Sequence, residues 1–182
     1  MCGNLAVLDA DFLNKINAIR SANPDELFLK LMTELSCSPV VHPFVAEELF
    51  NCGLAQRMLA AGHIRKIGYD EFLPNERRSQ YDQSFRELYH ILTLAEYGIE
   101  IEPDDDIFSR HAGKSYGEVH SILMASQLKI PVFYSNDHSG KILCKRFRNL
   151  RAETMNDIHE ALKGRTGCSI TSKEWKYLLH TR

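Results

Sequence analysis

The chain has 182 residues, of which 44% are hydrophobic and 25% are charged, and its formal net charge at pH 7 is -2. This length is typical of one domain that can bury a core without help from disulfides, and the composition is that of a soluble globular protein. The charge excludes a basic field over the whole protein but leaves room for a local basic surface.

The five cysteines are spread along the chain and form no Cys-x-x-Cys pair. An odd number without that spacing argues against a disulfide framework or a zinc knuckle, so we expect reduced thiols in a cytoplasmic protein. The first residues lack the basic region and apolar run of a secretory leader. Because no apolar stretch approaches the roughly 18 residues of a membrane-spanning helix, we expect no membrane partner.

Short apolar runs that predict strands alternate with segments of helical spacing. Strands are predicted at residues 4–9, 38–41 and 130–135, and helices at about 11–20, 24–35, 43–52, 53–63, 81–97, 117–129, 141–147, 153–163 and 173–180. Residues 64–80 mix turn formers with charge and predict no clear element, and 100–106 predict a solvated loop. The alternation predicts an α/β fold with a parallel central sheet flanked by helices on both faces.

Two acidic residues lie at the carboxyl ends of predicted strands. Asp9 closes the first strand, and Asp137 lies just beyond the strand at 130–135. Because ligands bind at this edge of a parallel α/β sheet, both acids are candidates for one shared site. Carboxylates are ligands that Mg²⁺ and Mn²⁺ prefer, and such cations support phosphodiester hydrolysis. The acids therefore predict a divalent-metal site.

Three segments resemble motifs of the PIN-domain nucleases. LDADFL (residues 8–13) resembles the acid at the end of their first strand, and VVHPFVAEEL (40–49) resembles their helix with a glutamate before a leucine. YGEVHSILMASQLKIPVFYSND (116–137) resembles their Gly-Glu helix, apolar strand and Ser/Thr-x-Asp ending. The resemblance is best at the start of the chain and over about 115–150. It implies a single PIN-like domain over 1–182, with a divergent helical insertion at about 64–113.

The resemblance implies a Mg²⁺- or Mn²⁺-dependent endoribonuclease that hydrolyses phosphodiester bonds with metal-activated water. The positions that match the family's catalytic and metal-binding acids are Asp9, Glu48, Glu118 and Asp137. Asp11 would be an auxiliary acid, and Ser135 would orient Asp137 through a hydrogen bond. Glu47 could take the role of Glu48 after a small rotation of the helix.

An RNA substrate would need cationic contacts for its phosphates. Candidates close to the acidic motifs are Lys114, His138, Lys141 and Lys145. A single strand or an exposed loop is expected as the substrate, because a duplex offers less access. Because the family includes toxin-type members, the resemblance also implies a protein partner such as an antitoxin. It implies a homodimer as well.

Two other functions stay open at this stage. A non-catalytic PIN-like module could bind RNA or protein and cut nothing. Asp9-Ala10-Asp11 also has the aspartate pair of haloacid dehalogenase-like phosphatases, in which the first aspartate is a nucleophile. That motif normally continues into Thr or Ser, whereas this chain has Phe12-Leu13. The phosphatase is therefore the minor alternative.

Overall fold

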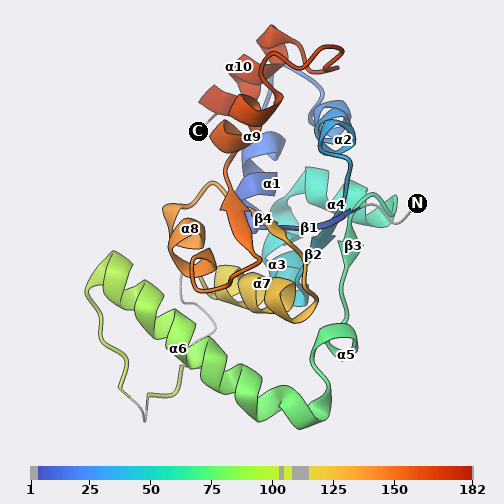
Figure 1. The fold of residues 1–182 in the computed structure, drawn as a ribbon. Coiled ribbons are helices and arrows are strands. Elements are labelled where there is room, and N and C mark those ends of the chain that lie inside the picture. The colour runs from blue at the N-terminus through green and yellow to red at the C-terminus, as the bar shows by residue number, and fades with distance from the viewer. Residues whose placement is uncertain (1–3, 103–104, 108–114, 182) are drawn as a thin grey trace.

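The computed structural model describes residues 4–102, 105–107 and 115–181. At its centre lies a five-stranded sheet in which every strand runs parallel to its neighbours (Figure 1). In spatial order the strands are β3 (Arg65–Lys66), β2 (Cys37–Val41), β1 (Asn4–Leu8), β4 (Val132–Tyr134) and β5 (Arg151–Glu153). The predicted α/β fold, with a parallel sheet flanked by helices, is confirmed.

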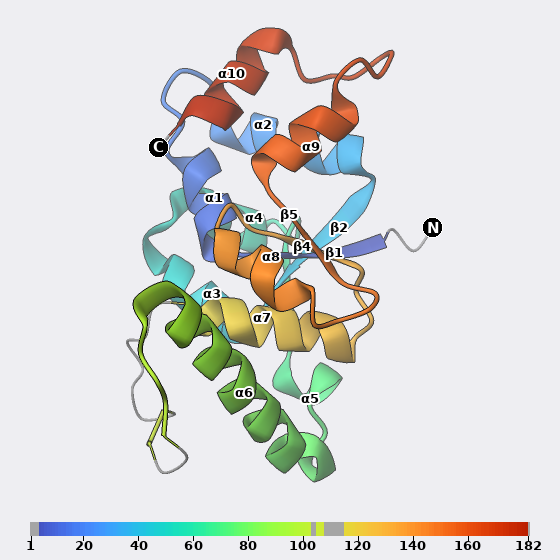
Figure 2. The same cartoon turned by 60° about the vertical axis from the view of Figure 1, so that its left-hand side comes forward.

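Successive residues of β1 point into two separate cores, as the two-residue period of a strand requires. Ala6 and Leu8 pack in one core, whose helices are α1 (Ala10–Asn17), α2 (Pro24–Leu35), α4 (Gly53–Ala60), α9 (Met155–Leu162) and α10 (Ser172–His180). Val7 packs in the other, whose helices are α5 (Tyr69–Phe72), α6 (Arg78–Tyr97), α7 (Tyr116–Gln127) and α8 (His138–Cys144). The two groups of helices lie on opposite sides of the sheet (Figure 2).

Neither edge strand of the sheet was predicted. β3 pairs Arg65 and Lys66 with Val40 and Val41, and β5 begins with Arg151 opposite Val132. Both strands are two or three residues long and carry charged side chains, so no apolar run marks them in the sequence. Because β3 belongs to the segment 64–113, that segment begins inside the sheet and continues into α5 and α6.

The helices beside the sheet's carboxyl edge differ in detail from the prediction. α6 begins three residues before residue 81, after a 3-10 turn, η2 (Asn75–Arg77). It ends, as expected, at Gly98, which has a left-handed φ of 64°. A turn was expected at 136–140 and a helix at 141–147, but α8 begins at His138 and ends at Cys144. Asp137, with φ -75° and ψ 142°, is therefore the N-cap of α8.

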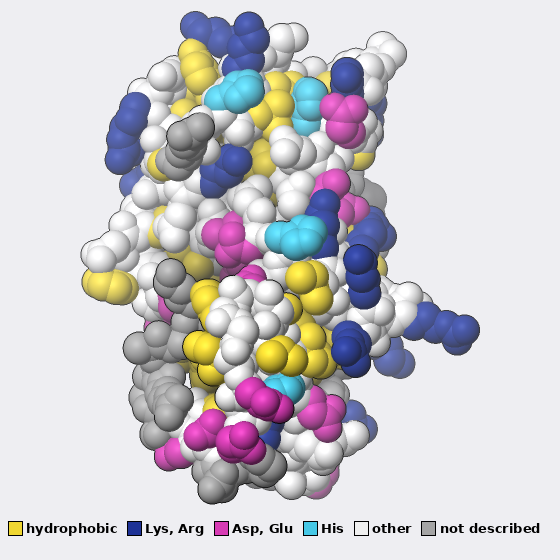
Figure 3. Space-filling view, turned by 90° about the vertical axis from the view of Figure 1, so that its left-hand side faces the viewer, with side chains coloured by type: hydrophobic (Ala, Val, Ile, Leu, Met, Phe, Trp, Pro, Cys, Tyr) yellow, Lys and Arg dark blue, Asp and Glu magenta, His cyan; other side chains and the backbone are white. Residues whose placement is uncertain are grey.

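The face that α6 and α8 present carries different kinds of side chain in different places (Figure 3). Acidic and apolar side chains meet in the middle of this face, and Lys and Arg side chains gather along one edge. Within the described part of the chain, no helix has the length and apolar character needed to cross a bilayer.

Candidate metal centre

The centre of the candidate site lies where β1 and β4 end side by side. Leu8 of β1 pairs with Tyr134 of β4, so the residues that follow each strand emerge next to one another. The N–H of Asp9 donates to the carbonyl oxygen of Tyr134 at 3.0 Å, which ties the two strand ends together. The structure thus brings Asp9 and Asp137 to one edge of the sheet.

Three carboxylates meet at this edge and form the acidic cluster of Asp9, Asp11 and Asp137. One carboxylate oxygen from each lies within 4.8 Å of the other two. Within the described ranges, no other three His, Cys, Asp or Glu side chains bring their ligand atoms this close together. Asp9 is buried, Asp11 is half-buried and Asp137 is exposed. The cluster therefore has a protein-covered side and a side open to solvent.

The segment Ser135-Asn136 holds two of these carboxylates in place. Ser135 Oγ lies 3.2 Å from Asp9 Oδ2 and 3.2 Å from Asp11 Oδ1, so its hydroxyl donates within this pair. The N–H of Asn136 donates to Asp11 Oδ2 at 2.7 Å. Ser135 was expected to orient Asp137, and its Oγ accepts a hydrogen bond from the backbone N–H of Asp137 at 3.1 Å. The carboxylates that its hydroxyl contacts are those of the other two acids.

Glu118 approaches the acidic cluster from the first turn of α7. It is only 3% exposed, and its Oε2 accepts a hydrogen bond from Ser139 Oγ at 2.8 Å. Its Oε1 is buried and has no hydrogen-bond partner among the described residues. Burial raises the pKa of Glu118 to about 8, with Ser139 acting in the opposite direction. Without a cation this carboxyl group keeps its proton at neutral pH.

A glycine makes room for that unpartnered oxygen. A Cβ on Gly140 would lie 3.0 Å from Glu118 Oε1 and 3.1 Å from the Phe133 ring. Both distances are tighter than ordinary van der Waals contact, so any larger residue at 140 would push against the glutamate. The sequence therefore keeps this side of Glu118 free of side chains.

Mutual repulsion among the acids adds to the effect of burial. Burial raises the pKa of Asp9 well above its usual range, and the charge of Asp11, and that of Glu118 once it is ionised, raise it further. Burial also raises the pKa of Asp137, and the charges of Asp11 and Glu96 add to this. A cation bound between the carboxylates would counter this repulsion and favour their ionised forms.

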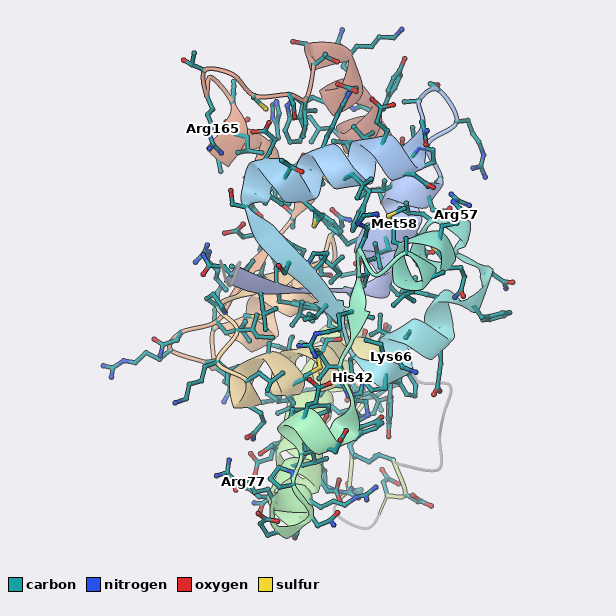
Figure 4. All side chains as sticks on the ribbon, turned by 90° about the vertical axis from the view of Figure 1, so that its right-hand side faces the viewer. His42, Arg57, Met58, Lys66, Arg77 and Arg165 are labelled. Atoms are coloured by element: carbon teal, nitrogen blue, oxygen red, sulfur yellow. The ribbon has the colours of Figure 1, made fainter. Side chains whose placement is uncertain are left out.

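Glu48 is the last residue of α3 (Pro43–Glu48). The N-cap of this helix is His42 (Figure 4), whose Nδ1 accepts a hydrogen bond from the N–H of Phe44 at 3.1 Å. Glu48 points toward α7, because a Cβ on Gly117 would lie 2.6 Å from its Oε2. Desolvation raises the pKa of Glu48. Its carboxylate is not one of the three that meet within 4.8 Å.

The structure separates the two neighbouring glutamates of α3. Both are exposed, and Glu47 lies close enough to Tyr69 of α5 for its charge to raise the pKa of that tyrosine, after the larger effect of burial. Glu48 instead lies against the N-terminal turn of α7, which carries Glu118. Of the two, Glu48 is the one directed toward the helix that contributes to the site.

One acidic neighbour of the site was not predicted from the sequence. Glu96 lies in the last turn of α6, and its negative charge contributes to the raised pKa of Glu118 and Asp137, after burial. No motif surrounds it, and it occupies an exposed position of an amphipathic helix. Only the packing of α6 against α7 and α8 brings it to the acidic cluster.

The predicted phosphate contacts have different surroundings. Lys114 lies outside the described residues. His138 is exposed at the start of α8. Lys141 forms an ion pair with Asp157, with Nζ 2.5 Å from Oδ2. Although burial acts to raise the pKa of Asp157, its hydrogen bonds hold that pKa at about 2, so this ion pair is retained at neutral pH.

A basic surface lies beyond the other end of α8 and consists of Lys129, Lys145, Arg146 and Arg148. These side chains line two adjoining cavities of about 240 and 320 Å³, which share Phe147 in their walls. Lys145 is the C-cap of α8. The helix places it roughly 12 Å from the N-cap at 1.5 Å per residue. The basic surface is therefore close enough for one oligonucleotide to reach both it and the acidic cluster.

Comparison with known proteins gives no further support for a family. No protein-family model, no curated protein and no solved structure matches the chain. The likeness to PIN-domain nucleases rests on the three sequence motifs, and membership of that family stays a prediction.

Proposed function

We propose that this protein is a nuclease that uses Mg²⁺ or Mn²⁺ at the acidic cluster to hydrolyse RNA. The observation that carries the proposal is the convergence of Asp9, Asp11 and Asp137, within 4.8 Å, at the carboxyl ends of two parallel strands. Glu118 supports it independently, because its buried Oε1 lacks a partner among the described residues. Carboxylate oxygens are the donors that these cations select, so the residues fit the metal.

Each acidic residue has a distinct part in this proposal. Asp9, Asp11 and Asp137 would hold the cation, and Glu118 would complete the set on losing its proton. When bound, the cation would lower the pKa of a coordinated water and neutralise charge on the phosphate. Ser135 restrains the carboxylates of Asp9 and Asp11. Asp137 is exposed, so a substrate can approach from its side.

The surroundings of the site support a polyanionic substrate. The basic surface of Lys129, Lys145, Arg146 and Arg148 can contact phosphates away from the scissile bond. Such contacts fix the position of a strand without reading its bases. A cytoplasmic location belongs to the same proposal, because the four cysteines within the described ranges are free thiols.

Cleavage assays with purified protein test this function. The wild type should cut single-stranded RNA with Mn²⁺ or Mg²⁺ and stop when EDTA is added. Asp9→Asn and Asp137→Asn should abolish cleavage while urea unfolding shows that the fold survives. Asp70→Asn is the matched control, because Asp70 is an exposed aspartate of α5.

Two outcomes would contradict the proposal in different ways. Cleavage that persists in both site variants would show that the acidic cluster is not the catalytic centre. A wild type that binds RNA in Mn²⁺ but cuts none would instead favour the non-catalytic module.

A further inference from the structure

The C-terminal turn of α6 forms one border of the acidic cluster. α6 packs against α7, which carries Glu118, and against α8, which follows Asp137. At the end of α6, Ser115 Oγ lies 3.5 Å from Glu96 Oε2, which links this helix to the residue before α7. The segment 64–113 therefore reaches the site through its longest described helix.

Tyr97, the last residue of α6, lies on this border and is 46% exposed. Its hydroxyl group is hydrogen-bonded to Glu96 and Ser115, and the charge of Asp137 acts on it. Burial raises the pKa of Tyr97, the two carboxylates raise it further, and a hydrogen bond with Ser115 lowers it. The ring thus combines an exposed surface with a position next to the open side of the acidic cluster.

Exposed apolar side chains concentrate around this tyrosine. Within the described ranges, five large hydrophobic side chains are exposed, and three of them are Leu94 at 49%, Tyr97 at 46% and Ile99 at 55%. These three lie within six consecutive positions, 94–99, beside an acidic site, where the fold does not require apolar residues. A ligand with a flat apolar part would bury this surface.

The helix end that carries the ring is fixed. The N–H groups of Gly98 and Ile99 donate to the carbonyl oxygens of Leu94 and Thr93 at 3.1 and 3.3 Å. With Gly98 in the left-handed conformation, this is the hydrogen-bonded cap that ends many helices. The backbone that carries Tyr97 is therefore fixed before any ligand binds, which lowers the entropy lost on binding.

Charge decides which part of a nucleic acid fits against this helix end. Glu96 is negatively charged and lies beside Tyr97, so it repels a phosphate backbone that passes over α6. The basic surface, near the C-terminal end of α8, attracts the same backbone. A strand lying across the acidic cluster would consequently direct its phosphates toward the basic surface and a base toward α6.

We propose that Tyr97 stacks on an unpaired nucleobase next to the phosphodiester held at the acidic cluster, which makes the substrate a single-stranded nucleic acid. This inference rests on the proposed function, and it gives α6 the role of a substrate-selecting wall. Aromatic rings stack on any base, so the contact selects an unpaired strand and not a sequence.

Two oligomers of equal length and charge test the stacking contact. One is a fluorescent oligouridylate, and the other has the same ribose-phosphate backbone without bases. Affinities are measured by anisotropy in Ca²⁺, a cation that carboxylates also bind. The wild type should prefer the oligomer with bases by roughly five- to a hundredfold, as expected for stacking on one base.

Three variants show whether Tyr97 is responsible. Tyr97→Ala should lose the preference for bases, whereas Tyr97→Phe should keep it because the ring remains. Tyr69→Ala is the matched control, because Tyr69 is also 46% exposed but lies on α5. It should bind like the wild type. Circular dichroism on each variant checks that the fold is intact.

The outcomes separate this inference from the proposed function. A Tyr97→Ala protein that cleaves RNA and still prefers the oligomer with bases would overturn the inference and leave the nuclease in place. A wild type that neither binds the oligomers nor cleaves RNA would overturn both. If Tyr97→Ala changes only self-association in sedimentation experiments, the apolar surface is a protein interface and the stacking contact is wrong.

Discussion

Replacing Glu118 with glutamine should remove a pH-dependent loss of stability from the metal-free protein. The folded protein holds the Glu118 proton up to a pKa of about 8, whereas the unfolded chain releases it near the ordinary value of 4.5. Between these values folding takes up a proton, so the free energy of unfolding falls as pH rises. Glutamine has the same shape and no proton to release.

The histidines of the core determine where this effect can be measured cleanly. Burial lowers the pKa of His42 to about 2 and that of His120 to about 3. Both therefore increase stability as pH rises through their unfolded value of 6.5, and their slope fades above it. Because both histidines are also present in Glu118→Gln, the difference between the two proteins isolates the slope from Glu118. From pH 6.5 to 8 this slope lowers the free energy of unfolding by about 2 kcal/mol, at ~1.4 kcal/mol per pH unit.

Urea unfolding in EDTA at pH 6.5, 7.5 and 8.5 measures the effect. Across this range the free energy of unfolding of the wild type should fall by about 2 kcal/mol more than that of Glu118→Gln. Glu76→Gln, a change at an exposed glutamate of η2, should follow the wild type. If the free energy of unfolding had the same pH slope in the wild type and in Glu118→Gln, Glu118 would not be protonated in the folded protein. Saturating Mn²⁺ should stabilise the wild type more than Glu118→Gln, because the cation binds the folded state.

Three further changes test the supports of the site. Ser135→Ala should weaken Mn²⁺ binding roughly 10- to 100-fold in calorimetric titrations, because two carboxylates lose their hydroxyl partner, and unchanged affinity would contradict its positioning role. Gly140→Ala should lower the free energy of unfolding by about 1–3 kcal/mol, since its Cβ would meet Phe133 at 3.1 Å; a neutral change in urea unfolding would argue against this close packing. Changing Arg146 and Arg148 to Gln should reduce the salt slope of single-stranded RNA binding by about 1.4, at ~0.7 per phosphate contact, and an unchanged slope would exclude them as contacts.

The sequence by itself determined the parts of the site in which chemistry and secondary structure are neighbours along the chain. Asp9 follows an apolar run and Asp137 follows another, so both were placed at the sheet's carboxyl edge before any tertiary contact was known. The apolar period of α6 and its end at Gly98 were equally local. These predictions succeeded because burial leaves a regular pattern in a single segment.

Other features depended on residues far apart in the sequence. β3 and β5 carry charged side chains and exist because they pair with apolar strands, so no local pattern predicts them. Lys141 was a candidate phosphate contact, but the structure places it against Asp157 of α9. A charge pattern gives the number of cations in a segment and not the partner that each one finds.

The border of the site was also decided by tertiary structure alone. Glu96 and Tyr97 look like ordinary exposed positions of an amphipathic helix, and only the packing of α6 on α7 and α8 brings them to the acidic cluster. The direction of Glu48 is likewise a tertiary feature, since the missing side chain of Gly117 leaves space for its carboxylate. Helical periodicity shows which face of a helix is buried, whereas the neighbour of an exposed side chain depends on how whole elements pack.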